Sequence, residues 1–300
     1  MSGLPDVEAL RLLVLVGELG SLGRAAAELG ITQPSASKRV ATLERRLGLA
    51  LIERTRRGST LTTDGQAVAD RSQRVLDELT ALMGDVEAHR SRLNGTLRVA
   101  ASMTVAEYLA PAWISELCHA HPDLHVGLQV TNSDHVPELL RSGAVEIGFI
   151  ESPFVPRGLI SRTVATDRLI VVVAPAHPWA RRRRPLLARE LAATALVVRE
   201  RGSGTRVALE RALRRAGAQE TRPLLELGSA AAVRGAVIAG TGPAVISELA
   251  VRTDIVDGRL VQVSVEGIEL RRALRAVWPA GRSLVGPAAD LLAVASHRPS

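Results

Sequence analysis

The chain has 300 residues, a formal net charge of +7 and 46% hydrophobic residues, so we expect a soluble globular protein of two or three compact units with real apolar cores. Aromatic residues make up only 2% of the chain. This scarcity argues against a protein that binds single-stranded nucleic acid by stacking bases on aromatic rings.

Residues 1–62 predict three helices followed by a hairpin. The first helix covers residues 5–19, with a buried stripe made by Val7, Leu10, Leu13 and Val14. The second covers residues 22–29 and ends at a glycine. The third begins after Thr32, which can cap it, and continues to about residue 47. Its first turn holds a proline, whose missing N–H costs nothing there.

The third helix is amphipathic in a way that suits the DNA major groove. Val40, Leu43 and Leu47 are spaced three and four apart and should share a buried stripe. The residues left to face outward are polar or cationic, namely Ser35, Ser37, Lys38, Arg39, Arg45 and Arg46. Short polar side chains in the first turn can bind base edges, while the cations bind phosphates.

A basic hairpin follows this helix. Gly48 ends the helix, and residues 51–54 and 59–61 flank a turn at residues 55–58, which predicts a wing. From Lys38 to Arg57 there are seven cations and two anions. Such clustered positive charge is typical of a surface that binds nucleic acid.

At these residues the chain resembles the LysR-type transcriptional regulators. The family pattern is matched, in order and without a gap, by Ala25, Ala26, Leu29, Gln33, Pro34, Ser37, Val40, Leu43, Glu44, Leu47, Gly48, Leu51, Arg54, Arg57, Leu61, Thr62 and Gly65. Ile52 departs from it, since an aromatic residue is common there. The alternative is a generic winged helix whose arginines are merely solvated.

From the helix, the hairpin and this resemblance we predict a winged helix-turn-helix DNA-binding domain at residues 1–62. Its expected DNA contacts are Thr32, Gln33, Pro34, Ser35, Ser37, Lys38, Arg39, Arg54, Arg56 and Arg57.

Residues 63–92 predict one long linker helix. Val68, Val75 and Leu82 recur every seven residues, with Leu79 and Val86 between them, which is the spacing of a coiled-coil seam. We interpret it as a dimerisation helix, because paired DNA-binding domains match paired half-sites. An ordinary amphipathic helix packed on its own domain is the alternative.

Residues 93–300 alternate strands with helices, which indicates βαβ units, a parallel sheet and two α/β lobes. The predicted strands are residues 97–101, 125–130, 146–150, 169–174, 195–199, 224–227, 243–246 and 271–278. Resemblance to the family's periplasmic-binding-protein-like effector domain implies that the last strand and helix return to the first lobe. Lobe I would then comprise residues 95–165 and 271–300, and lobe II residues 166–270.

Ligands of open α/β sheets bind beyond the carboxyl ends of the strands. The most informative such stretch is the loop from Gly202 to Thr205, which precedes a predicted helix and could bind an anion with its N–H groups and hydroxyls. Regulators of sulfur and carbon assimilation in the family resemble this form. An ordinary glycine-rich loop at a helix start is the alternative. The predicted effector contacts are Ser102, Met103, Thr104, Asn132, Glu151, Arg199, Gly202, Ser203, Gly204 and Thr205.

Catalysis has little support in the sequence. Ser203 lies outside a nucleophile-elbow pattern, and His119, His121, His125 and His135 lack the spacing of a metal site, so we expect no enzyme, no cofactor and no metal ion. The basic run at residues 181–184 predicts a solvated loop before a helix. Cys118 is interpreted as a small core residue.

The predicted function is ligand-responsive regulation of transcription. The expected partners are double-stranded promoter DNA, a small anionic metabolite and a second copy of the chain, with a homotetramer and RNA polymerase implied by the resemblance. No secretory signal or membrane-spanning stretch is recognisable, so we expect a cytoplasmic protein with no membrane partner. The second hypothesis is a solute-binding or enzymatic α/β protein that uses its helix-turn-helix for dimerisation only.

Overall fold

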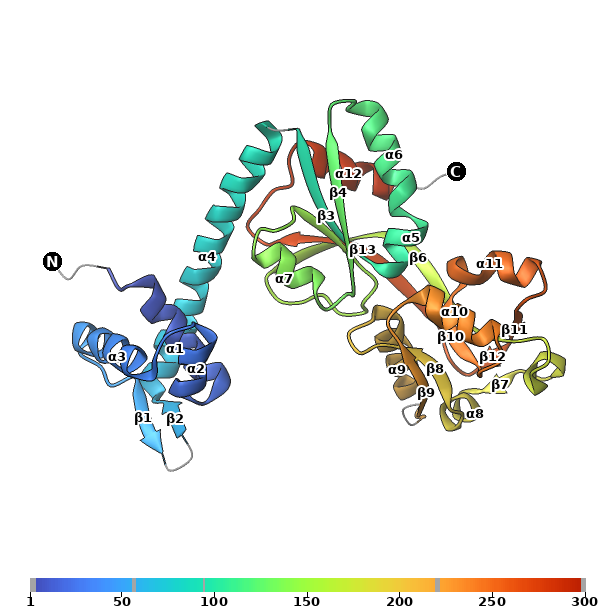
Figure 1. The fold of residues 1–300 in the computed structure, drawn as a ribbon, viewed down its shortest axis with the longest axis horizontal. Helices are drawn as coiled ribbons and strands as arrows, with labels where there is room; N and C mark the ends of the chain where they lie inside the picture. Colours follow the sequence, from blue (N-terminus) through green and yellow to red (C-terminus); the bar gives the residue numbers. More distant parts are fainter. Residues whose placement is uncertain (1–3, 56–57, 94, 219–221, 298–300) are drawn as a thin grey trace. The chain divides into compact units, whose positions relative to one another are not determined.

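The computed structural model describes residues 4–55, 58–93, 95–218 and 222–297 of the chain (Figure 1). It divides into two compact units, Met1–Met83 and Gly84–Ser300. Throughout these described ranges, no helix combines the length and the apolar character that crossing a lipid bilayer requires.

The first unit contains the predicted helices and hairpin. Its elements are α1 (Val7–Leu19), α2 (Leu22–Glu28), α3 (Gln33–Leu47), β1 (Ile52–Thr55), β2 (Gly58–Leu61) and the first part of α4 (Thr63–Leu93). Short polar side chains start the first three helices, since Asp6, Ser21 and Thr32 each accept a hydrogen bond from a backbone N–H in the first turn. Gly20 and Gly48 end α1 and α3 with left-handed backbone angles.

The core of the first unit differs from the predicted stripes at the helix ends. Leu12, Leu13 and Val16 of α1 are fully buried, and Val40 and Leu43 of α3 pack with them in two adjoining clusters. In contrast, Val7 is 41% exposed and Leu47 is 38% exposed, so both were wrongly assigned to a buried stripe. These two residues are the first of α1 and the last of α3, where neighbouring helices no longer cover the stripe.

The second unit is built on one continuous sheet that passes through both lobes. The strand order is β4-β3-β5-β13-β6-β10-β8-β9, and β11 also pairs with β6. The bounds are β3 (Thr96–Ser102), β4 (His125–Thr131), β5 (Ile147–Ile150), β6 (Leu159–Val173), β8 (Leu196–Arg199), β9 (Pro223–Leu227), β10 (Ala244–Ser247), β11 (Val261–Val263) and β13 (Arg271–Pro279).

The sheet contains both parallel and antiparallel strand pairs, whereas the sequence predicted a parallel sheet. Strand β3 runs parallel to β4 and β5, and β8 runs parallel to β9 and β10, as expected for strands joined through helices. The long strand β6 and the late strand β13 pair antiparallel along the whole of β13, with a register shift between Leu274 and Arg275. Only the second half of β6 was predicted, because its first half carries exposed polar residues that hide the strand pattern.

Helices cover the sheet of the second unit. Those predicted are α5 (Met103–Tyr108), α6 (Ala110–Ala120), α7 (Val136–Arg141), α9 (Gly204–Arg215) and α12 (Pro287–Ser296). Helix α8 (Ala188–Ala193) is the helix expected after the basic run. Elements that the sequence did not predict are the 3-10 helix η1 (Pro178–Arg181), β7 (Leu186–Leu187), α10 (Ala230–Ile238), α11 (Glu248–Val256), β11 and β12 (Val265–Glu266). Within the basic run, Arg182 is not simply solvated, because its Nη2 donates to Glu190 of α8 at 2.8 and 2.9 Å.

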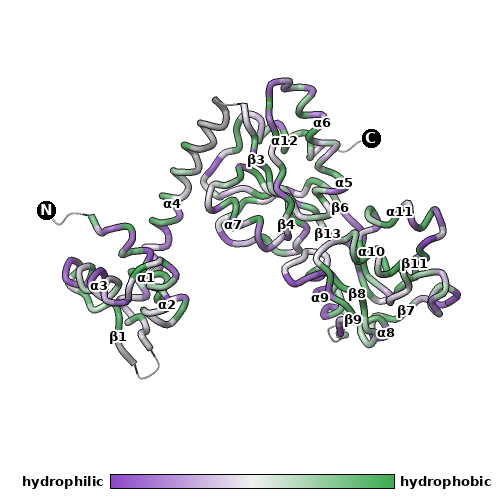
Figure 2. Tube along the Cα trace, viewed as in Figure 1, coloured by the Kyte–Doolittle hydropathy of each residue, from purple (hydrophilic) through white to green (hydrophobic). Residues whose placement is uncertain are grey.

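Two lobes follow from the clusters of buried residues. Lobe I packs around Leu97 and Phe149, and Leu274 of β13 and Leu291 of α12 belong to the same cluster, so the C-terminal elements pack with the first strands. Lobe II has a cluster on each face of its sheet, because alternate residues of β6 point to opposite faces. The trace through β3 and β8 is largely hydrophobic in Figure 2.

Candidate functional site

The N-terminal turn of α3 presents the predicted DNA contacts to solvent. Thr32 caps the helix by accepting from the N–H of Ser35 at 3.4 Å. Gln33, Pro34, Ser35 and Lys38 are exposed, and the trace around α3 is largely hydrophilic in Figure 2. This surface therefore offers hydrogen-bonding groups and a cation on one short stretch of helix.

Arg39 and the hairpin extend this surface. Arg39 is half-buried and its Nη1 lies 3.7 Å from Asp6 Oδ2 at the start of α1. Glu44 Oε1 accepts from the N–H groups of Leu51 and Ile52 at 2.8 and 3.2 Å, which fixes the start of β1 against α3. Strands β1 and β2 pair antiparallel as predicted. The remaining predicted contacts, Arg56, Arg57 and the side chain of Arg54, lie outside the described part of the chain.

Helix α4 carries an apolar stripe that is buried only at its beginning. Val68 packs against the core of the first unit. Further along the helix, Val75, Leu79, Leu82 and Val86 are 47%, 37%, 57% and 47% exposed in the single chain. Such a row at coiled-coil spacing is suited to packing against another helix.

The strand ends of the two lobes meet at one guanidinium group. Arg272, at the start of β13, donates from Nη1 to Thr205 Oγ1 at 3.0 Å and from Nη2 to Thr104 Oγ1 at 3.1 Å. Thr104 follows β3 in lobe I, and Thr205 lies in the first turn of α9 in lobe II. Both threonines are predicted effector contacts, and the structure joins them through Arg272, which the sequence did not single out.

Two buried carboxylates pair with this arginine. Arg272 Nε donates to Asp167 Oδ2 at 2.8 Å, and Arg272 Nη2 lies 2.8 Å from Glu151 Oε2. The side chains of Arg272, Asp167 and Glu151 are only 1%, 1% and 2% exposed. Ser247 Oγ donates to the second oxygen of Asp167 at 2.8 Å. A buried polar network has thus formed where the chain crosses between lobes.

The glycine-rich loop of lobe II packs closely on lobe I. A Cβ on Gly202, whose φ is +84°, would lie 2.9 Å from Asn132 Nδ2, and a Cβ on Gly204 would lie 2.5 Å from Glu151 Cγ. Glycine is therefore required at both positions for this approach. A second contact supports it, since Arg211 of α9 donates to the carbonyl of Pro153 at 3.1 Å.

The remaining predicted effector residues differ in how they are engaged. The hydroxyls of Ser102 and Ser203 are buried and find no hydrogen-bond partner among the described residues. Asn132 Oδ1 caps its own turn by accepting from the N–H groups of Asp134 and His135. Arg199 donates from Nε and Nη2 to Glu200 at 2.7 and 2.8 Å, while its buried Nη1 finds no hydrogen-bond partner among the described residues.

Helix α5 carries lobe I side chains into contact with lobe II. Met103 and Tyr108 pack against the lobe II cluster that contains Ile170 and Val251. Burial, reinforced by the neighbouring Glu107 carboxylate, raises the pKa of Tyr108 to about 12. The neutral phenol is therefore favoured by the contact between the lobes.

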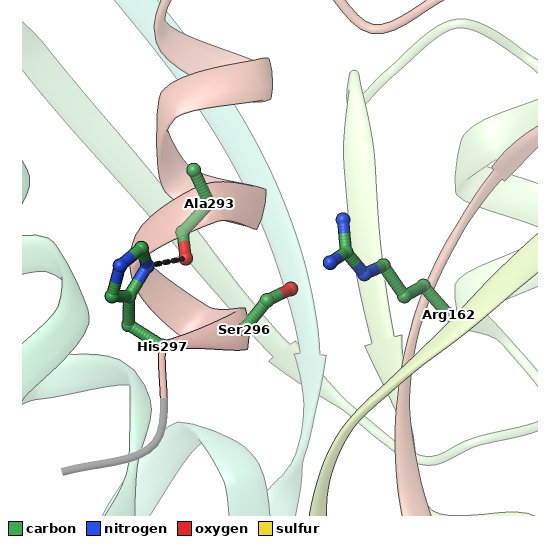
Figure 3. Close-up of a pocket in the computed structure, with 4 residues that line it drawn as sticks. All are labelled: Arg162, Ala293, Ser296 and His297. Atoms are coloured by element: carbon green, nitrogen blue, oxygen red, sulfur yellow. Dashed lines mark hydrogen bonds between the residues drawn. The ribbon is translucent and has the colours of Figure 1, made fainter. Parts of the chain in front are cut away.

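Among the described residues, no metal site coincides with this network, and the pocket described next lies away from it. No group of three or more His, Cys, Asp or Glu side chains among the described residues could hold a metal ion. A pocket of about 330 Å³ lies instead on lobe I, lined by Arg162 of β6 and by Ala293, Ser296 and His297 of α12 (Figure 3). It includes none of the residues predicted to bind an effector.

A winged helix-turn-helix with an exposed polar helix, followed by a two-lobed α/β domain, defines a transcriptional regulator that carries its own effector-type domain. The family description "Bacterial regulatory helix-turn-helix protein, lysR family" matches residues 7–66, and "LysR substrate binding domain" matches residues 90–298. The chain belongs to the LysR family of transcriptional regulators, which confirms the resemblance and the predicted fold class.

Relatives match over nearly their whole length. The uncharacterized HTH-type transcriptional regulator Rv2282c of Mycobacterium tuberculosis is 44% identical, covering 99% of this chain and 97% of that protein. The RuBisCO operon transcriptional regulator of Allochromatium vinosum is 34% identical, covering 95% and 93%. The structure of the Synechocystis PCC6803 CcmR regulatory domain with 2-PG has a TM-score of 0.61 at 24% identity, covering 67% of this chain and 95% of that domain.

Proposed function

We propose that this regulator binds promoter DNA sequence-specifically through α3 and the β1–β2 hairpin, and that a small anionic metabolite between the lobes alters this binding or the bend of the DNA. The role in DNA binding rests on the exposed first turn of α3. The role of the metabolite rests mainly on one observation, the sharing of Arg272 by Thr104 and Thr205 from opposite lobes.

That shared contact provides a physical link between a ligand and the lobes. A ligand can change the arrangement of the lobes only if its affinity differs between arrangements. A molecule that binds Arg272 and both threonines would do so, because these groups are close together only when the lobes are in contact. The DNA-binding domains of an oligomer would then respond to that arrangement.

An anion fits the chemistry of the site better than a neutral ligand. Arg272 supplies a buried cation, and the hydroxyls of Ser102 and Ser203 are buried donors without an acceptor. The start of α9 adds the positive end of a helix dipole. CcmR, a protein of the same fold, is described in complex with 2-PG, so 2-PG is included in the test below.

We propose further that α4 holds the protein as a homodimer, because its apolar row is exposed in the single chain. A tetramer and a contact with RNA polymerase remain predictions from the family resemblance. Catalysis forms no part of the proposal.

The test uses the full chain and a duplex operator selected from a random DNA pool. Operator affinity and footprint are measured with and without sulfate, inorganic phosphate, 2-PG and succinate, and the same anions are tested for a rise in melting temperature. At one hundred times its dissociation constant, a specific ligand should add about 2.7 kcal/mol to the free energy of unfolding. We expect one anion to change both readouts.

Thr205→Val should abolish the response, whereas Glu248→Gln, which alters a surface pair with Arg168, should preserve it. A response only to neutral compounds would contradict the anionic effector. Failure of the full chain to select any duplex at low salt would favour the second hypothesis, in which the helix-turn-helix serves dimerisation only.

A further inference from the structure

The buried network around Arg272 contains more negative than positive charge. One guanidinium is enclosed with two carboxylates, Glu151 and Asp167, and all three side chains are at most 2% exposed. A buried charge without a full complement of partners is costly. An anionic ligand could therefore bind Arg272 only if one of the two carboxylates moved away from it.

The two carboxylates are held unequally. Both oxygens of Asp167 accept hydrogen bonds, one from Arg272 Nε and one from Ser247 Oγ, each at 2.8 Å. The Glu151 carboxylate has only its ion pair with Arg272 Nη2, and Oε2 lacks a hydrogen bond of good geometry among the described residues. Moving the Glu151 carboxylate away from Arg272 therefore breaks fewer hydrogen bonds than moving the Asp167 carboxylate.

Four hydroxyl groups lie on the two segments that Arg272 joins, residues 102–104 and 203–205. Thr104 and Thr205 use their hydroxyl oxygens as acceptors from Arg272, so their O–H protons stay free to donate. Ser102 Oγ and Ser203 Oγ are buried without a partner in the described part of the chain. Four hydroxyl donors and a guanidinium suit the several oxygens of a phosphate, sulfate or carboxylate.

We propose that Glu151 is a built-in competitor for the anionic group of the effector. The Glu151 carboxylate lies 2.8 Å from Arg272 Nη2, which also lies 2.6 Å from Asp167 Oδ2, and the Glu151 side chain packs against Gly204 in the first turn of α9. A binding oxyanion replaces this carboxylate at Arg272 and takes the free hydroxyl donors. This inference rests on the proposed anionic effector and specifies which residue sets its affinity.

Competition of this kind determines selectivity. Exchange is favourable only for an anion that satisfies more donors than Glu151 does, so a multi-oxygen anion gains over a halide. The substitution Glu151→Gln should remove the competition and the repulsion between the glutamate and the bound anion. The glutamine keeps the size of the side chain and still offers an oxygen to Arg272.

The experiment measures binding of inorganic phosphate and of sulfate to the full chain by calorimetry. The proteins are the wild type, Glu151→Gln and the matched control Glu248→Gln, which removes the charge of an exposed glutamate paired with Arg168. We expect Glu151→Gln to bind at least one of the anions about tenfold more tightly or better, because like-charge contacts cost several kcal/mol and tenfold corresponds to about 1.4 kcal/mol. Glu248→Gln should match the wild type.

A wild type that binds phosphate or sulfate while Glu151→Gln binds it equally or more weakly would overturn the competitor role and leave the anion-responsive function standing. If none of the variants binds either anion, and 2-PG and succinate also fail, both proposals fall.

A second measurement does not depend on the variant folding. In a structure of the wild-type full chain with phosphate bound, a phosphate oxygen should lie within hydrogen-bond distance of Arg272 Nη2, and the Glu151 carboxylate should have moved away. Phosphate bound with the contact between Glu151 and Arg272 intact would contradict the inference.

Discussion

Arg272 and Asp167 face each other across strands β13 and β6, and their side chains are joined by a hydrogen bond of 2.8 Å. The pair lies where both strands pass between the lobes, and the same guanidinium reaches Thr104 in lobe I and Thr205 in lobe II. One side chain therefore ties the crossing strands to the facing ends of both lobes.

Removing this guanidinium should destabilise the second unit strongly. Arg272→Gln leaves Asp167 and Glu151 buried without a cation, and we expect a loss of about 3–5 kcal/mol in the free energy of unfolding. Arg168→Gln is the control, because its pair with Glu248 is partly exposed and should contribute at most about 1 kcal/mol.

Urea unfolding followed by tryptophan fluorescence suits this test, since the chain's three tryptophans all lie in the second unit, namely Trp113, Trp179 and Trp278. Equal losses in the two variants would contradict the prediction.

Tyr108 should report contact between the lobes. It is the single tyrosine of the chain, and burial raises its pKa to about 12 from an ordinary value of about 10. Because the neutral form is favoured in the folded state, this stabilisation is complete below pH ~10 and is lost as the pH rises towards 12.

Ultraviolet absorbance of the phenolate measures this titration directly. Gly204→Ala places a methyl group against Glu151 and should separate the lobes, lowering the pKa of Tyr108 towards its ordinary value. Gly228→Ala, where a Cβ meets nothing within 4 Å, should leave the titration unchanged. An ordinary pKa for Tyr108 in the wild type would show that its burial does not persist in solution.

Gly65 should be indispensable for the first unit. A Cβ there would overlap the carbonyl oxygen of Leu51, so Gly65→Ala forces α4 away from the start of the hairpin. We expect a loss of about 1–3 kcal/mol, measured by calorimetry. Gly23→Ala in α2 meets only ordinary contacts at 3.6 Å or more and should be neutral or stabilising by up to about 1 kcal/mol. A tolerated Gly65→Ala would mean that α4 packs differently on Leu51.

The exposed row on α4 should hold the oligomer. Leu82→Glu puts a charge at a position that is 57% exposed in the single chain, so it should leave each protomer folded and raise the monomer fraction in sedimentation equilibrium. Arg74→Glu introduces the same carboxylate at an exposed position outside the row and should keep the wild-type mass. Identical masses for the wild type, Leu82→Glu and Arg74→Glu would exclude this row as the interface.

The predicted DNA contacts in α3 and in the hairpin should separate into two kinds. Gln33→Ala and Ser37→Ala should relax base preference, with about 1–3 kcal/mol of discrimination lost where a base edge is bound. Lys38→Ala and Arg57→Ala should weaken binding to all sequences and flatten the salt dependence by about one unit per lost phosphate contact. Footprints and salt titrations distinguish these effects, and unchanged sequence preference in both the Gln33 and Ser37 variants would refute the assignment.

Local patterns in the sequence were sufficient for much of the fold. Helix α3 was predicted closely because its cap at Thr32, its buried Val40 and its stop at Gly48 are all signals within one segment. Helices α10 and α11 were missed, because α10 is almost uniformly apolar and neither helix carries a clear amphipathic pattern. The first half of β6 was missed for the opposite reason, since its exposed polar residues lack alternation.

By itself, then, the sequence determined the helix-turn-helix, the family, and the segments after two strands that carry Thr104 and Thr205. It could do so because helix caps, periodicity and glycine turns are signals that act over a few residues. Only the tertiary structure decided that Arg272 lies between those threonines and binds Asp167. Arg272, Leu274 and Ala276 alternate along β13 and are all buried, so the arginine lies on an inner face of the sheet. No local sequence pattern indicates which residues it binds. Those partners lie 168, 105 and 67 residues away along the chain, and only the pairing of β13 with β6 brings them together.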